Sequence, residues 1–325
     1  MRFSSLIAAS FLSFLGAACA SAPRQPIGTT LDMPRVDPPP PKPAQAPLVP
    51  DDVVVRSAQP FRGQRNADGH TLEEAQLFDE LSHYDVVCLG EAHDAPRDHY
   101  AELAITEGLE RRARVSGRAL GVGFEMFQAP YGDALHAYSI GSLDDAGLQK
   151  RTQYEKRWGY PYAYYRPVLE LGRAYGLPLK ALNASRELTH AVAEQGISDL
   201  PRRLRRQLPD ELNMSDAEHR AAFDKLMAGH PHTDGAGFDV DNFYAAQVVW
   251  DETMAANATR WVMARAPSRQ MLVLAGSAHC RHPAIPARIE RREPPLRVAG
   301  VRLSSDSNDD SAGFDYTLRF DGAAN

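Results

Sequence analysis

The sequence predicts an α/β fold: a mainly parallel sheet flanked by helices, with a helical subdomain inserted over the carboxyl edge of the sheet. Short apolar runs bounded by glycine, which lets the backbone turn sharply where a strand stops, are typical of buried strands. Helical stretches separate these runs, and such β-α-β alternation is typical of parallel sheets. Two of the runs end in the same phrase, Gly-x-x-His, at His93 and His279. The four runs cover residues 86–89, 120–124, 177–182 and 271–275.

The chain begins with a segment typical of an export signal. Residues 1–19 hold a basic residue, an apolar stretch too short to span a bilayer permanently, and small residues before Cys19. The end of this segment resembles a bacterial lipoprotein signal, which makes Cys19 the expected lipidation site. Ordinary cleavage after Ala20 or Ala22 is the alternative.

A linker and one folded domain follow the signal segment. Residues 20–50 are rich in proline, which predicts a stiff, extended linker. The folded domain is expected over residues 51–322, with a helical insertion over about 128–240. The other expected elements are a helix from a capping box at Thr71-Leu72-Glu73-Glu74 to about Leu81, a loop and helix over 94–115, a helix over 242–264, and a hairpin of 296–303 and 314–320.

Chemically capable side chains stand at the ends of the predicted strands. Glu91 and His93 follow the first run, Glu125 follows the second, and His279 follows the last. Because parallel strands place their carboxyl ends at one edge of a sheet, we expect these groups to meet in one pocket. Four more residues are expected to orient them from behind: His99, Asn183, Gln247 and Asp251.

Three roles are open for Glu91, His93, Glu125 and His279. Two imidazoles with carboxylates suffice to bind zinc or another divalent metal, with one carboxylate left as general base for hydrolysis. Without a metal, a glutamate and a histidine can activate water for ester cleavage. In a purely structural role, the four side chains form a buried hydrogen-bonded network that closes the edge of the sheet.

Charge and cysteine content narrow the function classes. The net charge of −6 at pH 7 gives no basic excess, so a nucleic-acid partner is not expected. Cys88 and Cys280 stand at the two strand ends that carry the Gly-x-x-His phrases. They are either buried small apolar side chains or, in an oxidising compartment, a disulfide.

An ordered set of motifs indicates a family. The motifs are Val86–Asp94, Gly123–Phe127, Tyr165-Arg166-Pro167, Ala181–Asn183, Ala246–Ala255 and Leu274–His279, with Phe314–Tyr316 as a closing strand. In this order they resemble the ChaN-like haem-binding lipoprotein family, part of the Tiki/TraB/erythromycin-esterase-like superfamily. The resemblance implies an α/β sheet with a helical subdomain, export as a lipoprotein, and haem binding linked to iron acquisition.

The resemblance also implies haem held at a homodimer interface by a tyrosine. A phenolate is a hard ligand suited to ferric iron. Tyr165 is the first candidate, Tyr164 and Tyr162 are the next, and Arg166 suits a haem propionate. The alternative for this aromatic segment, residues 154–165, is core packing. Some relatives in the superfamily are instead hydrolases, including metalloproteases with two Gly-x-x-His phrases and a glutamate, all of which this sequence retains.

We therefore expect an exported, lipid-anchored haem-binding protein of the cell envelope, in the periplasm or at the outer membrane, and soluble in the periplasm if Cys19 is not lipidated. One alternative is a metal-dependent or Glu/His-dependent hydrolase, an esterase or protease, on the same scaffold. The other is a non-catalytic surface-binding lipoprotein.

Overall fold

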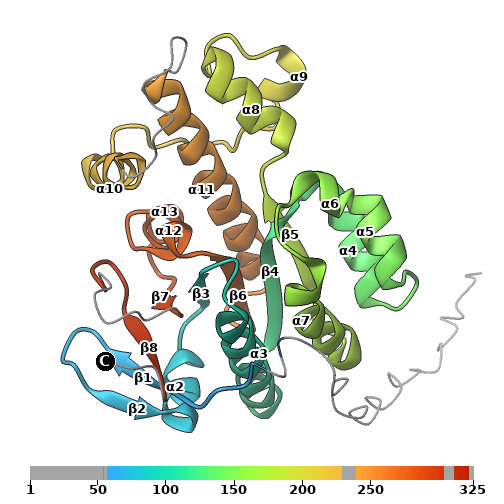
Figure 1. Cartoon of the computed structure of the whole chain (residues 1–325), viewed down its shortest axis with the longest axis vertical. Coiled ribbons are helices and arrows are strands. Elements are labelled where there is room, and N and C mark those ends of the chain that lie inside the picture. The colour runs from blue at the N-terminus through green and yellow to red at the C-terminus, as the bar shows by residue number, and fades with distance from the viewer. Residues whose placement is uncertain (1–53, 55–56, 229–238, 304–310, 322–325) are drawn as a thin grey trace, which may run out of the picture. The chain divides into compact units, whose positions relative to one another are not determined.

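The computed structural model describes residues 54, 57–228, 239–303 and 311–321 (Figure 1). The expected signal segment with Cys19 and the proline-rich linker over 20–50 lie outside the described residues. In the described part of the chain, no helix is both long enough and apolar enough to cross a membrane.

One sheet of eight strands, in the order β2-β1-β8-β7-β3-β6-β4-β5, runs through the described residues. Neighbouring strands from β8 to β5 are parallel, whereas β1 pairs antiparallel with both β8 and β2. The predicted fold class, a mainly parallel α/β sheet flanked by helices, is confirmed. The strands are β1 (Phe61–Arg65), β2 (Thr71–Glu73), β3 (Val86–Glu91), β4 (Ala119–Gln128), β5 (Leu179–Asn183), β6 (Arg269–Gly276), β7 (Val298–Arg302) and β8 (Tyr316–Phe320).

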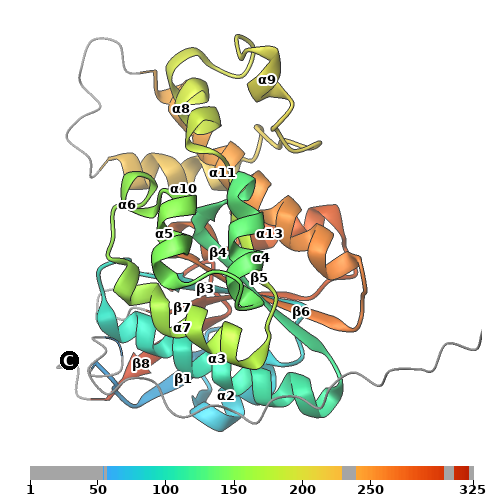
Figure 2. The same ribbon diagram turned by 90° about the vertical axis from the view of Figure 1, so that its right-hand side faces the viewer.

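Helices connect the strands and flank the sheet (Figures 1 and 2). They are α2 (Glu74–Leu81), α3 (Pro96–Ser116), η1 (Ala129–Tyr131), α4 (Gly132–Ser139), α5 (Asp145–Thr152), α6 (Tyr154–Arg157), α7 (Tyr162–Tyr175), α8 (Arg186–Gln195), α9 (Arg202–Arg205), α10 (Ala217–Met227), α11 (Val240–Met263), α12 (Ser277–Cys280) and α13 (Ile285–Arg292).

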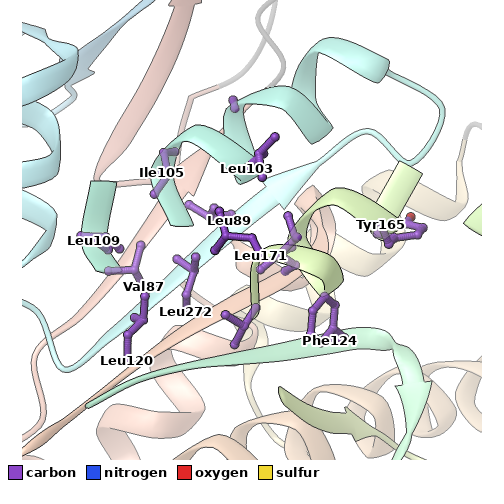
Figure 3. Close-up of a cluster of buried hydrophobic side chains, with 14 of the residues drawn as sticks. Val87, Leu89, Leu103, Ile105, Leu109, Leu120, Phe124, Tyr165, Leu171 and Leu272 are labelled. Carbon is purple, nitrogen blue, oxygen red and sulfur yellow. The ribbon is translucent and has the colours of Figure 1, made fainter. Parts of the chain in front are cut away.

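The two faces of the central strand β3 pack into different cores. Val87 and Leu89 lie in a cluster with side chains of α3 and α7, part of which Figure 3 shows. Val86 and Cys88 lie in a second cluster, with side chains of α11 and α13. Because successive side chains of a strand point to opposite faces, a parallel strand covered on both sides is apolar throughout. This explains the unbroken apolar run that ends at Glu91.

The helices within the expected insertion form two groups, because β5 separates them in sequence. The segments η1 and α4–α7 precede β5, and α8–α10 follow it. Figure 1 shows β5 leading into α8 at the end of the sheet where α9 and α10 also lie. Helical structure therefore stands over the carboxyl edge, where the candidate site residues were expected.

Two local predictions were wrong in detail. The capping box consists of Glu73 and Gln76 rather than Thr71 and Glu74, because residues 71–73 form the edge strand β2 and the helix starts only at Glu74. The expected hairpin is absent from the described residues: β7 and β8 are neighbours but run parallel, with Val301 opposite Tyr316. The two strands therefore point the same way, whereas the strands of a hairpin are antiparallel.

Candidate functional site

The two Gly-x-x-His phrases lie on neighbouring parallel strands, with Glu91 at the end of β3 directly opposite Gly276 at the end of β6. Neither Gly90 nor Gly276 has a positive φ. A Cβ on Gly276 would lie 2.9 Å from Nε2 of His93, and one on Gly90 would lie 3.0 Å from the Ser277 Cα. Glycine is therefore needed at both positions because neighbouring atoms lie too close for a side chain, and not for the sharp backbone turn that the sequence suggested.

The first polar group, called here the Glu91 network, consists of Glu91, His93, His99, Glu102 and Tyr165. Oε1 of Glu91 accepts a hydrogen bond from the Tyr165 hydroxyl at 2.8 Å and lies 2.5 Å from Nδ1 of His93. Oε2 of Glu91 lies 3.3 Å from Nδ1 of His99, and that nitrogen also lies 3.0 Å from Oε2 of Glu102. All five side chains are buried except His93, which is 22% exposed.

Burial and close charges shift the pKa values of the Glu91 network. Burial acts to raise the pKa of Glu91, but His93 and His99 outweigh it and hold the pKa well below its usual range. Burial acts to lower the pKa of His99, but Glu102 and Glu91 raise it to about 11. Burial and the Glu91 charge raise the pKa of Glu102 well above its usual range.

The second group, called the His279 network, consists of Glu125, His279, Asp251, His219 and Tyr244. His279 lies between two carboxylates: Nε2 is 3.3 Å from Oε1 of Glu125, and Nδ1 is 2.5 Å from Oδ1 of Asp251. The other Asp251 oxygen lies 2.9 Å from Nε2 of His219. Nδ1 of His219 lies 3.1 Å from the Tyr244 hydroxyl. Polar contacts therefore run without a break from β4 through α12 and α11 to α10.

In the His279 network the opposite charges stabilise one another. Burial opposes ionisation of Asp251, but His279 and His219 outweigh it and lower the pKa of this carboxyl below its usual range. Burial acts to lower the pKa of His279, but Glu125 and Asp251 raise it well above its ordinary value. The two carboxylates therefore favour the imidazolium form of His279 over the neutral ring.

Three further contacts fix Glu125 and His279. The backbone N–H of Gly276 donates to Oε2 of Glu125 at 2.8 Å, and the Asn183 amide donates to the Glu125 carbonyl at 2.9 Å. Nε2 of Gln247 lies 3.3 Å from Nδ1 of His279. The residues expected to orient the site thus lie against it.

His93 is the partly exposed member of the Glu91 network, and carboxylates of both networks, Glu91 and Glu125, act on it. Burial acts to lower its pKa, but Glu91 and Glu125 outweigh it and raise the pKa above the ordinary value. The His93 ring centroid lies 5.0 Å from that of Trp158 and 4.8 Å from that of Tyr160. Tyr160 is 37% exposed. His93, Trp158 and Tyr160, called here the aromatic rim, therefore offer aromatic surface beside the polar groups.

A pocket of about 330 Å³ opens beside the His279 network. His219 and Gln247 belong to its polar lining, and Phe223 and Phe314 to its apolar walls. Arg281 also lines the pocket. A cavity of this size is typical of small-molecule sites, for which the usual range is about 300–1,000 Å³.

The environment of Tyr165 does not suit the role of first haem candidate. Tyr165 is fully buried at the edge of the core cluster in Figure 3, and its hydroxyl donates to Glu91. Burial, followed by the charges of Glu91 and Glu102, raises the pKa of Tyr165 above its ordinary value. In this conformation the phenol is committed to the Glu91 network instead of facing an external iron.

The other haem candidates are partly exposed. The Tyr162 hydroxyl donates to Asp145 at 2.6 Å. The Tyr164 ring stacks on that of His99 at 4.8 Å. Nε of Arg166 lies 3.7 Å from Oε1 of Glu170.

The predicted metal set Glu91, His93, Glu125 and His279 does not form one compact ligand group. Glu91 pairs with His93, while Glu125 pairs with His279. Among the described residues, the ligand atoms that all lie within 4.8 Å of one another belong to Glu91, His99 and Glu102. The prediction missed Glu102 because helix α3 approaches β3 only in the tertiary structure, although its spacing of three from His99 placed both on one helix face.

His219 escaped the sequence reasoning. It lies on a short helix far from the strands in sequence, where nothing in the local pattern indicated a buried partner. Trp158 and Tyr160 belong to the aromatic segment whose flat surface the sequence suggested for a haem, but their contact with His93 depends on the tertiary structure.

Cys88 and Cys280 form a disulfide, with Cα atoms 5.3 Å apart. Of the two possibilities that the sequence left open, this is the oxidised one. The bond joins β3, which carries Glu91, to α12, which carries His279. It thereby ties the two networks together covalently.

Fold and site define an α/β protein that gathers glutamate and histidine side chains at the carboxyl edge of a parallel sheet. The family model described as "Haem-binding uptake, Tiki superfamily, ChaN" matches residues 77–289, more than half of the chain. The chain belongs to this haem-binding uptake family, as the sequence motifs predicted. Comparison with curated proteins found no match.

A solved structure shares the fold, and two others align more weakly. ChaN of Campylobacter jejuni, solved with cofacial haem binding, is 19% identical with a TM-score of 0.65, and the match covers 81% of this chain and 97% of that one. An erythromycin esterase, EreC, in its open conformation is 12% identical with a TM-score of 0.43, covering 80% and 82%. RRSP, a MARTX toxin effector domain from Vibrio vulnificus, is 15% identical with a TM-score of 0.39, covering 76% and 37%.

Proposed function

We propose that this protein binds haem at the aromatic rim, as part of haem or iron uptake. Family membership is the observation that carries the proposal. The local surface supports it, because Trp158 and Tyr160 offer aromatic area to a macrocycle beside the partly exposed ring of His93. Burying flat aromatic surface is a main source of affinity for such ligands.

The iron ligand is a tyrosine of the segment that contains Tyr160, Tyr162 and Tyr164. Tyr160 comes first, because it is the most exposed of these phenols and lies at the rim. Binding of ferric iron favours the deprotonated phenol, and the positive charge of His93 acts in the same direction. Arg166 remains our candidate for a haem propionate, since a guanidinium binds a carboxylate through two hydrogen bonds.

Titration with ferric haem tests the proposal. Adding haem to the purified protein is expected to shift the Soret band, and Tyr160→Phe is expected to weaken binding at least about ten-fold, or about 1.4 kcal/mol. Tyr175→Phe, at the far end of α7, is the matched control and should bind as the wild type does. Tyr162→Phe and Tyr164→Phe compare the other ligands. A wild type that gives no Soret shift contradicts the proposal.

We propose further that haem binding joins two copies of the chain. The Campylobacter protein binds haem cofacially, and two haems stack face to face only if two sites meet. Light scattering of the haem-loaded protein is expected to give twice the monomer mass of 35.8 kDa, less any signal segment removed. A monomer at saturating haem contradicts this part.

Export and anchoring through Cys19 form a separate proposal. The lipoprotein-like signal supports it, and so does the Cys88–Cys280 disulfide, since disulfides persist in oxidising compartments. Labelling with a radioactive fatty acid is expected to mark the wild type, and Cys19→Ala is expected to lose the label while remaining exported. A labelled Cys19→Ala protein rules out this anchor.

A Glu/His-dependent hydrolase is the second candidate function. It rests on the position of Glu125 between His93 and His279, next to the pocket. If the protein hydrolyses model nitrophenyl esters, Glu125→Gln is expected to lower kcat at least about 100-fold, a typical contribution of acid–base catalysis. Glu187→Gln, at an exposed glutamate, is the control. Equal activity in both variants eliminates this candidate.

A further inference from the structure

A buried cluster of two carboxylates and one imidazole, distinct from the aromatic rim and from the His279 network, lies between β3 and α3. Its donors are Glu91 on β3 and His99 and Glu102 on α3, whose ligand atoms all lie within 4.8 Å of one another. Each of the three residues is at most 1% exposed. Their spacing of three along α3 puts His99 and Glu102 on the face that packs against the sheet.

The orientation of His99 leaves its Nδ1 facing the two carboxylates. Nε2 of His99 lies 3.1 Å from the backbone carbonyl oxygen of His93. A carbonyl oxygen only accepts hydrogen bonds, so Nε2 carries a proton and the neutral ring has its lone pair on Nδ1. A histidine that donates its outer N–H to a carbonyl while its other nitrogen faces inward is the usual arrangement of a metal ligand.

Two carboxylate oxygens of the cluster have unused hydrogen-bonding capacity. Neither Oε2 of Glu91 nor Oε1 of Glu102 receives a hydrogen bond, although both are buried. Oε2 of Glu91 lies 3.3 Å from Nδ1 of His99, so it points into the cluster. Its other oxygen is held by Tyr165 and His93, which fixes the carboxylate plane. Buried polar atoms without partners are costly, and a cation between them removes that cost.

Spacing and charge indicate the class of ion. The Nδ1 of His99 lies 3.0 Å from the Glu102 oxygen and 3.3 Å from the Glu91 oxygen. Ligands about 2.0–2.1 Å from a tetrahedral zinc ion stand roughly 3.3 Å apart, so little movement is needed. Metal binding displaces the protons of its ligands, and with both carboxylates ionised and His99 neutral the cluster carries two negative charges, which a divalent ion balances. One nitrogen and two oxygen ligands suit zinc or another first-row transition metal.

We propose that Glu91, His99 and Glu102 bind a divalent transition-metal ion, such as zinc, inside the protein. The ion joins α3 to β3. Through Glu91 it also fixes His93, because Glu91 and His93 are in direct contact. The site shares no residue with the His279 network or with the proposed haem ligands.

Metal binding by the full-length protein tests the proposal. The protein is purified without a metal-affinity column, stripped with a chelator, and titrated with Zn²⁺ or with Co²⁺, whose visible spectrum reports tetrahedral coordination. We expect one ion per chain and a zinc-dependent rise in Tm. Glu102→Gln, which keeps the side-chain shape, is expected to lower zinc affinity at least about ten-fold, as ligand-shell changes typically do. Glu110→Gln, a buried carboxylate of the same helix outside the cluster, is the control and should keep the ion.

The results distinguish a cluster that binds a metal ion from one that is held together by a proton on His99. If the wild type binds no ion, or if Glu102→Gln binds zinc as well as the wild type does, the proposal is overturned, and a doubly protonated His99 holds the two carboxylates together. If Glu102→Gln does not fold, the shorter carboxylate of Glu102→Asp takes its place, with the same expected loss of affinity. Haem titration of the same variants is expected to remain near wild type, so failure of one proposal leaves the other testable.

Discussion

The Glu91 network and the His279 network grow from the same phrase on adjacent strands, but their hydrogen bonding differs. Around Glu91, two buried carboxylate oxygens receive no hydrogen bond. In the His279 network, no buried polar side-chain atom of the five residues lacks a partner, and acids alternate with imidazoles from Glu125 to His219. One network thus has capacity for an added cation, whereas the other is balanced by its own charges.

The difference comes from the helices that cover each strand end. α3 brings a second carboxylate, Glu102, towards Glu91, whereas α11 and α10 bring Asp251 and His219 towards His279. The repeated motif therefore determines the position of each imidazole, while the side chains on the covering helices determine its partners and its charge.

Removing the disulfide between the networks is expected to have the largest effect on stability. Cys88→Ala combined with Cys280→Ala opens a loop of 192 residues, and bonds that close long loops contribute about 3–5 kcal/mol. Urea unfolding measures the loss. A double variant within 1 kcal/mol of the wild type would mean that packing of α12 alone holds the two networks together.

Removing the charge of Asp251 is expected to cost about 3 kcal/mol, because it breaks a buried ion pair and leaves the partner charge uncompensated. Asp251 contacts both His219 and His279, so Asp251→Asn removes a carboxylate partner from both rings. Urea unfolding at pH 7 measures the change. If the cost is below 1 kcal/mol, the His279 network is not held together by charge.

The ion pair of Asp251 and His279 also predicts how the free energy of unfolding depends on pH. The pKa of His279 is raised above 6.5, so its contribution is complete below pH 6.5 and is lost as pH rises through the folded-state pKa. The pKa of Asp251 is lowered below 3.8, so its contribution is present above that pH and is lost on further acidification. Unfolding at a series of pH values should show both losses. Asp251→Asn should flatten the alkaline one, and an unchanged profile would contradict this assignment.

A methyl group on Gly276 is expected to cost about 1 kcal/mol, at the low end for overpacking. The added Cβ meets the far end of the His93 ring, which can move aside, instead of rigid backbone. Gly276→Ala should therefore change the His93 imidazole signals in NMR spectra more than it changes stability. In Gly300→Ala the new Cβ would lie 2.4 Å from the Cys280 carbonyl oxygen, so this comparison variant should lose more stability.

The smallest effect is expected outside both networks. His190 pairs with Glu194 at 3.1 Å on an exposed helix face, with side chains 69% and 64% exposed. His190→Ala should change the free energy of unfolding by no more than about 0.5 kcal/mol, as is usual for surface positions. It gives the baseline against which the buried histidines are measured.

The sequence alone determined the fold class, the positions of the central strands β3, β4, β5 and β6, and the meeting of the two histidine phrases. Apolar runs report burial on both faces, and parallel strands share one carboxyl edge, so both properties follow from local pattern. Only the tertiary structure decided which acid faces which imidazole, that Tyr165 is buried while Tyr160 is exposed, and that β7 and β8 run parallel. Those features depend on how helices and strands that are distant in sequence pack against one another. No local sequence pattern determines these contacts.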